Sequence, residues 1–242
     1  MSRGSMLRRT LLGTWLLCSA LQAGAARAET QRKNLDVLEH YRHFPKKLIK
    51  TYFPLTRKGD AWVTKSTAGW ELSATVDILN GYIHIADEGT GGGTIDLQFV
   101  LFKTADRKPL IALCETDMDG IGVTHGLRFF LRRGGAWTDV TKTVLPPISI
   151  RDFIDQDWLQ ANRSKVDSLL ESIGEKYSGF HFELPRHGTT IKVHAKLSML
   201  VSICPMLGVD AVDDLDCQAL SERKARDVIA LKWNRAKTRF ER

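Results

Sequence analysis

The feature that most restricts how this chain can fold is a succession of short alternating segments from Thr75 to Leu145, separated by glycine-containing turns. Within a segment, apolar residues recur at every second position, the period of a β-strand with one buried face. Four or five segments follow one another with no helical periodicity between them. Consecutive strands joined by short turns pair with their chain neighbours, so this order predicts an antiparallel meander.

The register of the first hairpin is predicted from its turn. Asn80-Gly81 separates two apolar segments, and this dipeptide favours a two-residue turn in which both residues have positive φ. The predicted cross-strand pairs are Val76 with Ile85, Ile78 with Ile83, and Asp77 with His84. One face of the sheet is then apolar and the other is solvated.

Later segments extend this sheet. Leu110–Cys114 is a continuous apolar run, typical of a central strand buried on both faces. After the next alternating segment, Gly134-Gly135 predicts another tight turn. If that turn has two residues, Arg132 lies opposite Trp137, where a guanidinium stacks on an indole.

Beyond Pro146-Pro147 the chain returns to helix and then to strands. Residues 162–173 have the spacing of an amphipathic helix, and Gly174 follows them. Two alternating segments flank the turn at 185–190, the second of them running from Ile191 to Val201. Matching their apolar faces pairs Phe182 with Val193, Glu183 with Lys192, and His181 with His194. A last hairpin is predicted around Asn234.

These segments predict an α+β fold, mainly antiparallel sheet built as a meander and hairpins, with a few short helices. Short helices are also expected before the first strands, one beginning at Leu35 and one between Pro45 and Phe53. The order of helix and then strands occurs twice. The exported region, 29–242, is therefore either one continuous domain or two lobes, 29–147 and 148–242.

Residues 1–28 have the pattern of a cleaved secretory signal peptide. A basic stretch with Arg8 and Arg9 precedes the apolar run Leu11–Leu21, and Ala26-Arg27-Ala28 is an A-x-A cleavage site. The apolar run is too short to span a bilayer, and no later run approaches ~20 apolar residues. We expect a periplasmic or secreted protein without a transmembrane span, exported by the general secretory or the twin-arginine route.

The charge balance changes when this leader is removed. The whole chain has 35 basic and 28 acidic residues, a net charge of +7. Four arginines lie in the leader, so 31 basic residues remain against 28 acidic ones, a net charge of +3. This modest charge and the predicted export argue against a nucleic-acid partner.

Three cysteines remain after the leader. Cys204 and Cys217 are thirteen residues apart, and in an oxidising compartment they are expected to form a disulfide worth ~3 kcal/mol. Cys114 lies in the most apolar segment and is expected to be a buried free thiol that packs as a small apolar side chain.

Two sequence features are candidates for metal binding. Asp117 and Asp119 precede Gly120 in an acidic turn, and His181 and His194 form the predicted cross-strand pair. Carboxylates suit calcium and imidazoles suit zinc, but two ligands are fewer than the three that zinc needs from a protein. The competing interpretations are a solvated acidic turn and ordinary surface histidines.

No pattern of catalytic residues or of an organic cofactor site stands out. The glycine loop lacks the Gly-Lys-Ser/Thr of a phosphate loop, and the sequence has no G-x-S-x-G motif. We therefore expect a non-enzymatic binding module of the cell envelope, whose partner is an envelope protein or polymer. Its expected recognition loops contain Gly89, Thr90, Gly91, Gly92, Gly93, Asp117 and Asp119. The alternative is an exported hydrolase, metal-assisted, that uses Asp117 and Asp119 with a histidine.

Overall fold

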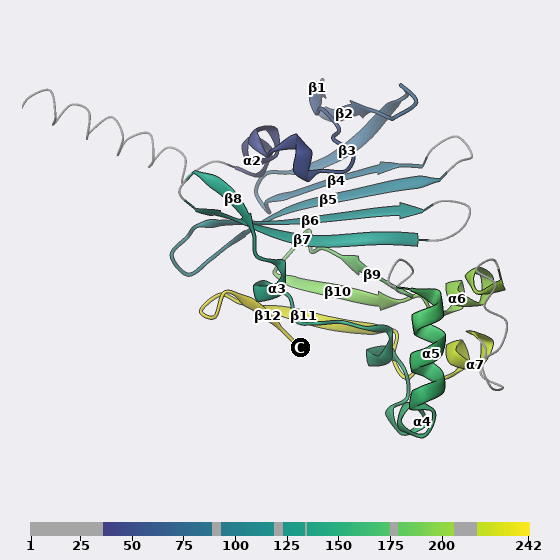
Figure 1. The fold of residues 1–242 in the computed structure, drawn as a ribbon. Coiled ribbons are helices and arrows are strands. Elements are labelled where there is room, and N and C mark those ends of the chain that lie inside the picture. Colours follow the sequence, from purple (N-terminus) through teal and green to yellow (C-terminus); the bar gives the residue numbers. More distant parts are fainter. Residues whose placement is uncertain (1–35, 89–92, 119–122, 134, 175–178, 206–216) are drawn as a thin grey trace, which may run out of the picture. The chain divides into compact units, whose positions relative to one another are not determined.

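The computed structural model describes residues 36–88, 93–118, 123–133, 135–174, 179–205 and 217–242. Residues from Val37 to Arg242 form one compact unit. The predicted leader, residues 89–92 of the glycine loop and Asp119 lie outside the described residues. The architecture is an α+β fold with mainly antiparallel sheet, as the sequence predicts (Figure 1).

The described residues contain an eight-stranded antiparallel sheet whose spatial order follows the chain, β1 to β8, and which we call the large sheet. The predicted meander is therefore confirmed, and it extends by two strands before Glu71. Its strands are β1 (Thr56–Lys58), β2 (Ala61–Lys65), β3 (Glu71–Asp77), β4 (Tyr82–Asp87), β5 (Thr94–Lys103), β6 (Pro109–Met118), β7 (Val123–Arg133) and β8 (Ala136–Asp139).

A second antiparallel sheet, the small sheet, has the order β12-β11-β10-β9. Its strands are β9 (Phe180–Glu183), β10 (Thr190–Ala195), β11 (Val228–Asn234) and β12 (Arg239–Glu241). The helices are α2 (Val37–His43), α3 (Thr141–Val144), α4 (Gln156–Ala161), α5 (Arg163–Ile173), α6 (Leu197–Ile203) and α7 (Cys217–Glu222), with 3₁₀ turns η1 (Lys46–Leu48) and η2 (Ile150–Phe153). No helix among the described residues is long and apolar enough to cross a membrane.

Both faces of the central strands β4–β7 are covered. This confirms the prediction for Leu110–Cys114 in β6, whereas the solvated face predicted for the first hairpin is wrong for β4. Residues 37–55, which we call the N-terminal segment, bury one face in a cluster with Ile83, Phe99 and Ile111. The small sheet buries the other face in a cluster with Tyr82 and Ala112. Figure 1 shows α2 and the small sheet on opposite sides of these strands. The covering strands begin at Phe180, 47 residues beyond the end of β7 at Arg133, too far along the chain for alternation to reveal.

The first hairpin has a longer turn than predicted. Val76 pairs with Ile83, so the loop has four residues and the predicted register is wrong by two positions. The Asp77 carboxylate accepts hydrogen bonds from the backbone N–H and the side-chain amide of Asn80, at 3.1 and 2.9 Å. These bonds close the wider loop, in which Gly81 has the expected positive φ of 68°. Because side chains alternate between the two faces of a strand, a register shift of two residues leaves each paired side chain on its predicted face.

Two other registers are confirmed. Arg132 pairs with Trp137 across the β7–β8 turn, with the guanidinium 5.9 Å from the indole centroid. In the small sheet, the pairs are those predicted: Phe182 with Val193, Glu183 with Lys192, and His181 with His194.

The second half of the Ile191–Val201 segment is a helix, which corrects the predicted strand. β10 ends at Ala195 and α6 begins at Leu197. Leu197 and Leu200 are buried, and their spacing of three suits a helix, although the alternation in polarity that begins at Ile191 continues as far as Met199. α6 packs against α7, and the predicted disulfide between Cys204 and Cys217 joins them with a Cα–Cα distance of 6.4 Å.

Candidate functional site

The strongest concentration of polar groups outside the turns lies where β9 meets the face of the large sheet. We call it the β9 joint. It combines side chains from adjacent strands of each sheet: His84, Asp96 and Gln98 on β4 and β5, and His181, Glu183 and His194 on β9 and β10. His84 and Gln98 are direct cross-strand partners, so the meander itself places them side by side.

Backbone groups on the free edge of β9 form hydrogen bonds with side chains of the large sheet. β9 pairs with β10 on one side only. On its other side, the Leu184 N–H donates to Oε1 of Gln98 at 2.8 Å, and the Cys114 thiol lies 3.9 Å from the Phe182 carbonyl oxygen. An edge strand that would otherwise present unpaired backbone groups is thereby closed.

Cys114 is the buried free thiol that the sequence predicts. Burial raises its pKa to about 12, and the nearby Asp96 charge adds to the effect. The thiolate form needed for a nucleophile is therefore suppressed at neutral pH. Its position in the fold is that of a small packing residue beneath β9.

Asp96 holds His84 in a fixed orientation. Its Oδ2 lies 2.5 Å from Nε2 of His84, and its Oδ1 accepts a hydrogen bond from the Gln98 amide at 2.9 Å. Burial raises the pKa of Asp96, but the hydrogen bonds from His84 and Gln98 outweigh it, so the net pKa is lowered. An ionised carboxylate that orients an imidazole is a common element of acid–base sites.

His181 and His194 stack on each other, as their predicted pairing allows. Their ring centroids are 5.0 Å apart with an interplanar angle of 17°. Nε2 of His194 lies 2.7 Å from a Glu183 oxygen, whereas Nδ1 of His181 is buried and has no hydrogen-bond partner within the described residues. Burial, followed by the charges of His194 and Lys196, lowers the pKa of His181. His181 is therefore neutral at neutral pH.

This geometry orients imidazoles but does not gather ligands around a point. Stacked rings place their nitrogens side by side, whereas a metal needs lone pairs that converge on it. In the part of the chain that the structure describes, no group of three or more His, Cys, Asp or Glu side chains is arranged to hold a metal ion. Asp119, the other carboxylate of the predicted acidic turn, is outside those residues.

Asp117 lies on the opposite face of the large sheet from the β9 joint. It is on the same face of β6 as Glu115, and its carboxylate lies 2.5 Å from Nζ of Lys50. Glu115 accepts hydrogen bonds from the Lys50 N–H at 2.5 Å and from Arg128 at 2.8 Å. These contacts attach the N-terminal segment to the sheet. The structure does not bring Asp117 together with His181 or His194.

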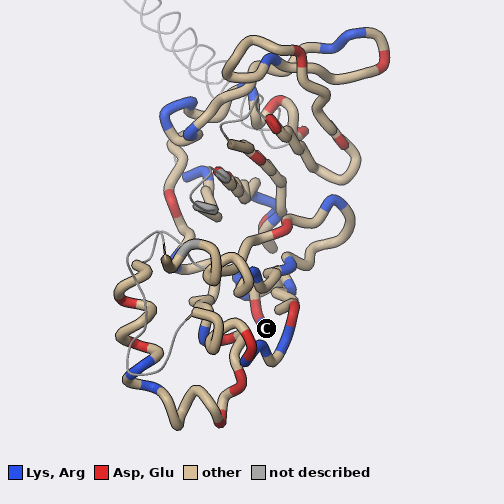
Figure 2. Tube along the Cα trace, turned by 90° about the vertical axis from the view of Figure 1, so that its right-hand side faces the viewer, with Lys and Arg blue, Asp and Glu red and all other residues tan. Residues whose placement is uncertain are grey.

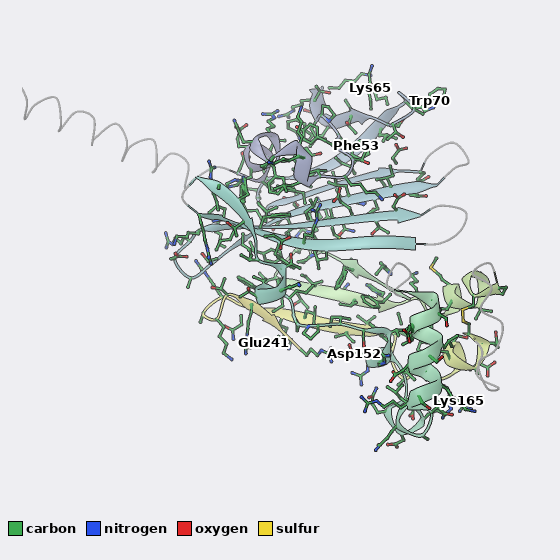
Figure 3. All side chains as sticks on the ribbon, viewed as in Figure 1. Phe53, Lys65, Trp70, Asp152, Lys165 and Glu241 are labelled. Carbon is green, nitrogen blue, oxygen red and sulfur yellow. A yellow bond between two sulfur atoms is a disulfide. The ribbon has the colours of Figure 1, made fainter. Side chains whose placement is uncertain are left out.

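A second feature, which the sequence analysis missed, is an exposed indole at the end of β2 and β3. Trp70 is 63% exposed and follows a turn whose ends are joined by hydrogen bonds between Ser66 and Trp70 (Figure 3). The backbone N–H of Thr67 donates to the buried Asp87 carboxylate at 3.1 Å. The sequence signal for this turn was Ser66 and Gly69, which are common turn residues. It was missed because the short polar segment before Trp70 was interpreted as one irregular strand.

Alternate connections of a meander lie at the same edge of its sheet. The β2–β3 turn therefore lies at the same edge of the large sheet as four other strand ends. Asp87 and Thr94 flank one predicted recognition loop, and Met118 and Val123 flank the other. We call this the turn edge. The exposed Leu79 belongs to the β3–β4 turn and so lies at the other end of β3.

Comparison with known proteins shows a distant likeness to one solved structure. No protein-family model matches this chain, and no curated protein matches it. A solved domain of an uncharacterized protein from Porphyromonas gingivalis W83 has 12% sequence identity and a TM-score of 0.47. The match covers 78% of this chain and 79% of that chain.

Proposed function

We propose that this protein is a non-enzymatic binding module of the cell envelope that recognises an envelope protein or polymer through the turn edge. The observation that carries the proposal is Trp70, an exposed indole on a backbone fixed by hydrogen bonds. The predicted leader and the disulfide support a periplasmic or secreted location, because disulfides persist in oxidising compartments.

An exposed tryptophan on a rigid turn is suited to binding. Indoles supply a large contact area at a low entropic cost, and they dominate the binding energy in many interfaces. Here the turn is already held by Ser66 and by the buried Asp87. The conformational entropy that this turn loses when a partner binds is therefore small. The strand ends that flank the predicted loops extend this surface along the same edge.

Charge does not define the proposed surface. Basic and acidic positions are interspersed along the described trace in both sheets (Figure 2). Near Trp70, Lys58 is paired with Glu71 across the sheet at 2.9 Å. Aromatic and hydrogen-bonding contacts would therefore select the partner, with little contribution from a field of one sign.

The alternative function is an exported hydrolase, which the His84–Asp96 pair favours. An imidazole oriented by a carboxylate is suited to a general base. The two functions depend on different residues. A hydrolase would depend on His84 and tolerate the loss of Trp70, whereas a binding module would show the reverse.

The proposal is tested by cross-linking in cells that produce the full chain, followed by mass spectrometry of the captured species. Wild type is compared with Trp70→Ala and with Leu79→Ala, a matched truncation of a side chain that is 98% exposed. We expect one dominant envelope component whose recovery falls at least tenfold in Trp70→Ala and is unchanged in Leu79→Ala. Equal recovery from all three chains would exclude Trp70 as the recognition residue.

A further inference from the structure

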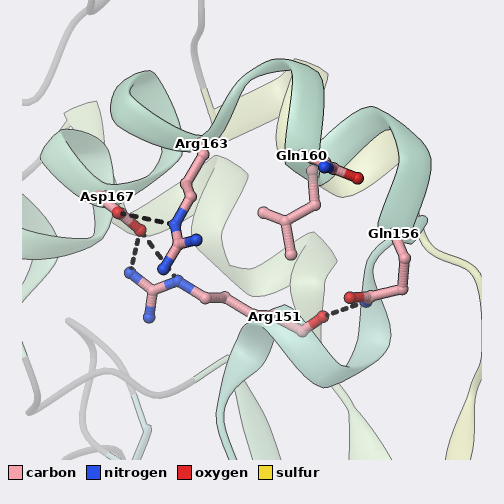
Figure 4. A pocket seen from close by; sticks show the side chains of 6 residues that line it. Arg151, Gln156, Gln160, Arg163 and Asp167 are labelled. Atoms are coloured by element: carbon pink, nitrogen blue, oxygen red, sulfur yellow. Dashed lines mark hydrogen bonds and ion pairs between the residues drawn. The ribbon is translucent and has the colours of Figure 1, made fainter.

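A separate pocket lies between η2, α4 and α5, in the helical part that flanks the small sheet (Figure 4). Its volume is about 590 Å³, which is within the range of small-molecule sites. The lining is polar apart from one leucine, and it consists of Arg151, Gln156, Leu159, Gln160, Arg163 and Asp167. Guanidinium and carboxamide groups therefore dominate the chemistry of this pocket.

Two of the lining side chains are held in place by the protein. Arg151 donates from Nε and Nη2 to the same oxygen of Asp167, at 3.1 and 2.6 Å. The amide nitrogen of Gln156 donates to the carbonyl oxygens of Arg151 and Ile154, at 2.9 and 2.8 Å. The pocket is thus pre-organised on one side, which lowers the entropic cost of binding.

Arg163 is held less tightly than Arg151. Its side chain is 81% exposed, and its Nε forms an ion pair with Asp167 at 3.9 Å, beyond hydrogen-bond distance. Figure 4 shows both guanidiniums directed toward the same carboxylate. Two positive charges against one negative charge leave the pocket with a net charge of +1. An oxyanion is the group that would balance this charge and use the planar donors of Arg163.

We propose that this pocket binds a sugar residue that carries one anionic group, either a carboxylate or a phosphate. The oxyanion would pair with Arg163 beside Arg151. The carboxamides of Gln156 and Gln160 would hydrogen-bond the hydroxyl groups, and Leu159 would contact the apolar face of the ring. The volume exceeds what a bare anion fills and accommodates a sugar ring with its substituents. The site does not depend on Trp70 or on the turn edge.

Isothermal titration calorimetry on the full chain tests this proposal with three sugars: glucuronate, glucose 6-phosphate and glucose. The variant is Arg163→Gln, and the matched control is Arg226→Gln, which alters an exposed arginine outside the pocket. We expect at least one acidic sugar to bind tenfold or more tightly than glucose. Its affinity should fall at least tenfold in Arg163→Gln and remain unchanged in Arg226→Gln and in Trp70→Ala.

The two acidic sugars distinguish the sources of the anion. Preference for glucuronate indicates a uronate, and preference for glucose 6-phosphate indicates a sugar phosphate. The proposal is overturned if neither acidic sugar binds more tightly than glucose, or if Arg163→Gln retains the wild-type affinity. Thermal unfolding of each variant shows that a loss of binding is not a loss of fold. Because the pocket and Trp70 are tested by separate variants, a negative result for the pocket does not contradict the proposed function at the turn edge.

Discussion

The two coverings of the large sheet are built from different chemistry. The N-terminal segment covers one face with an apolar cluster rich in aromatic rings, in which Tyr41 and Phe44 meet Phe99 edge-on at 5.2 and 5.4 Å, and Lys50 pairs with Asp117 beside this cluster. The small sheet covers the other face with an apolar cluster as well, but its first strand is attached through Gln98 and lies beside two histidine–carboxylate pairs. Each attachment therefore combines apolar burial with polar contacts, which involve Lys50 and carboxylates on one face and histidines, carboxylates and Gln98 on the other.

The difference indicates which of the two attachments is expected to respond to pH. Burial of aromatic rings does not change with proton concentration, so the contribution of these rings to the N-terminal attachment is expected to stay the same as the pH falls. The β9 joint contains His181, whose pKa is lowered mainly by burial, so its protonation places charge where it is poorly solvated. Changes at the two attachments should therefore differ in size and in pH dependence.

The largest effect is expected at the aromatic attachment. Phe99→Ala removes a fully buried ring that contacts Tyr41 and Phe44, and it leaves a cavity between the sheet and α2. We expect the free energy of unfolding to fall by about 3–5 kcal/mol. Urea denaturation measures the change, and Leu79→Ala serves as an exposed control with an expected effect within about 0.5 kcal/mol. A loss below about 1 kcal/mol would show that this face is not held by its aromatic core.

An intermediate effect is expected where β9 attaches. Gln98→Leu leaves the Leu184 N–H without its acceptor and removes a donor from Asp96. An unsatisfied buried donor costs about 1–3 kcal/mol, so the free energy of unfolding should fall by that amount. The control is Thr75→Val, which lies in the same cross-strand row and should change stability by less than about 0.5 kcal/mol. Equal effects of the two substitutions would mean that the Gln98 hydrogen bond is dispensable.

The smallest effect at neutral pH, and the one that separates the two attachments most sharply, concerns His181. Its pKa is lowered in the folded protein, so the unfolded chain binds more protons once the pH falls below the ordinary histidine value of 6.5. Stability contributed by the neutral ring is complete above that pH and is lost as the pH falls toward the lowered pKa. Wild type should therefore lose stability between pH 7 and pH 5.

His181→Phe keeps the ring stacked on His194 but removes the titrating group and the buried nitrogen, which has no hydrogen-bond partner among the described residues. At pH 8 we expect the variant to be equally stable or stabilised by up to about 1 kcal/mol. On acidification it should lose less stability than wild type, as measured by urea denaturation at several pH values. Parallel pH profiles for the two proteins would show that the acid response originates elsewhere.

Features set by neighbouring residues were predictable, and those set by distant segments were not. Alternation predicted the meander, and matching the apolar faces gave the His181–His194 pairing. The four-residue loop at Asn80 was missed because the Asp77 side chain competes with the tight turn. The switch from strand to helix after Ala195 was missed because the alternation of β10 continues through Leu197 to Met199, the first turn of the helix.

The sequence by itself determined the fold class, the cysteine pair and the facing of the strand residues, because period-two patterning and cysteine spacing act within short stretches of chain. Only the tertiary structure decided which groups meet. It placed Asp117 and the histidines on opposite faces, brought Gln98 to the edge of β9, and left Trp70 exposed on a fixed turn. The first two depend on how one sheet packs on the other, and the third depends on Asp87 of a neighbouring strand. Such contacts join residues that no local pattern relates.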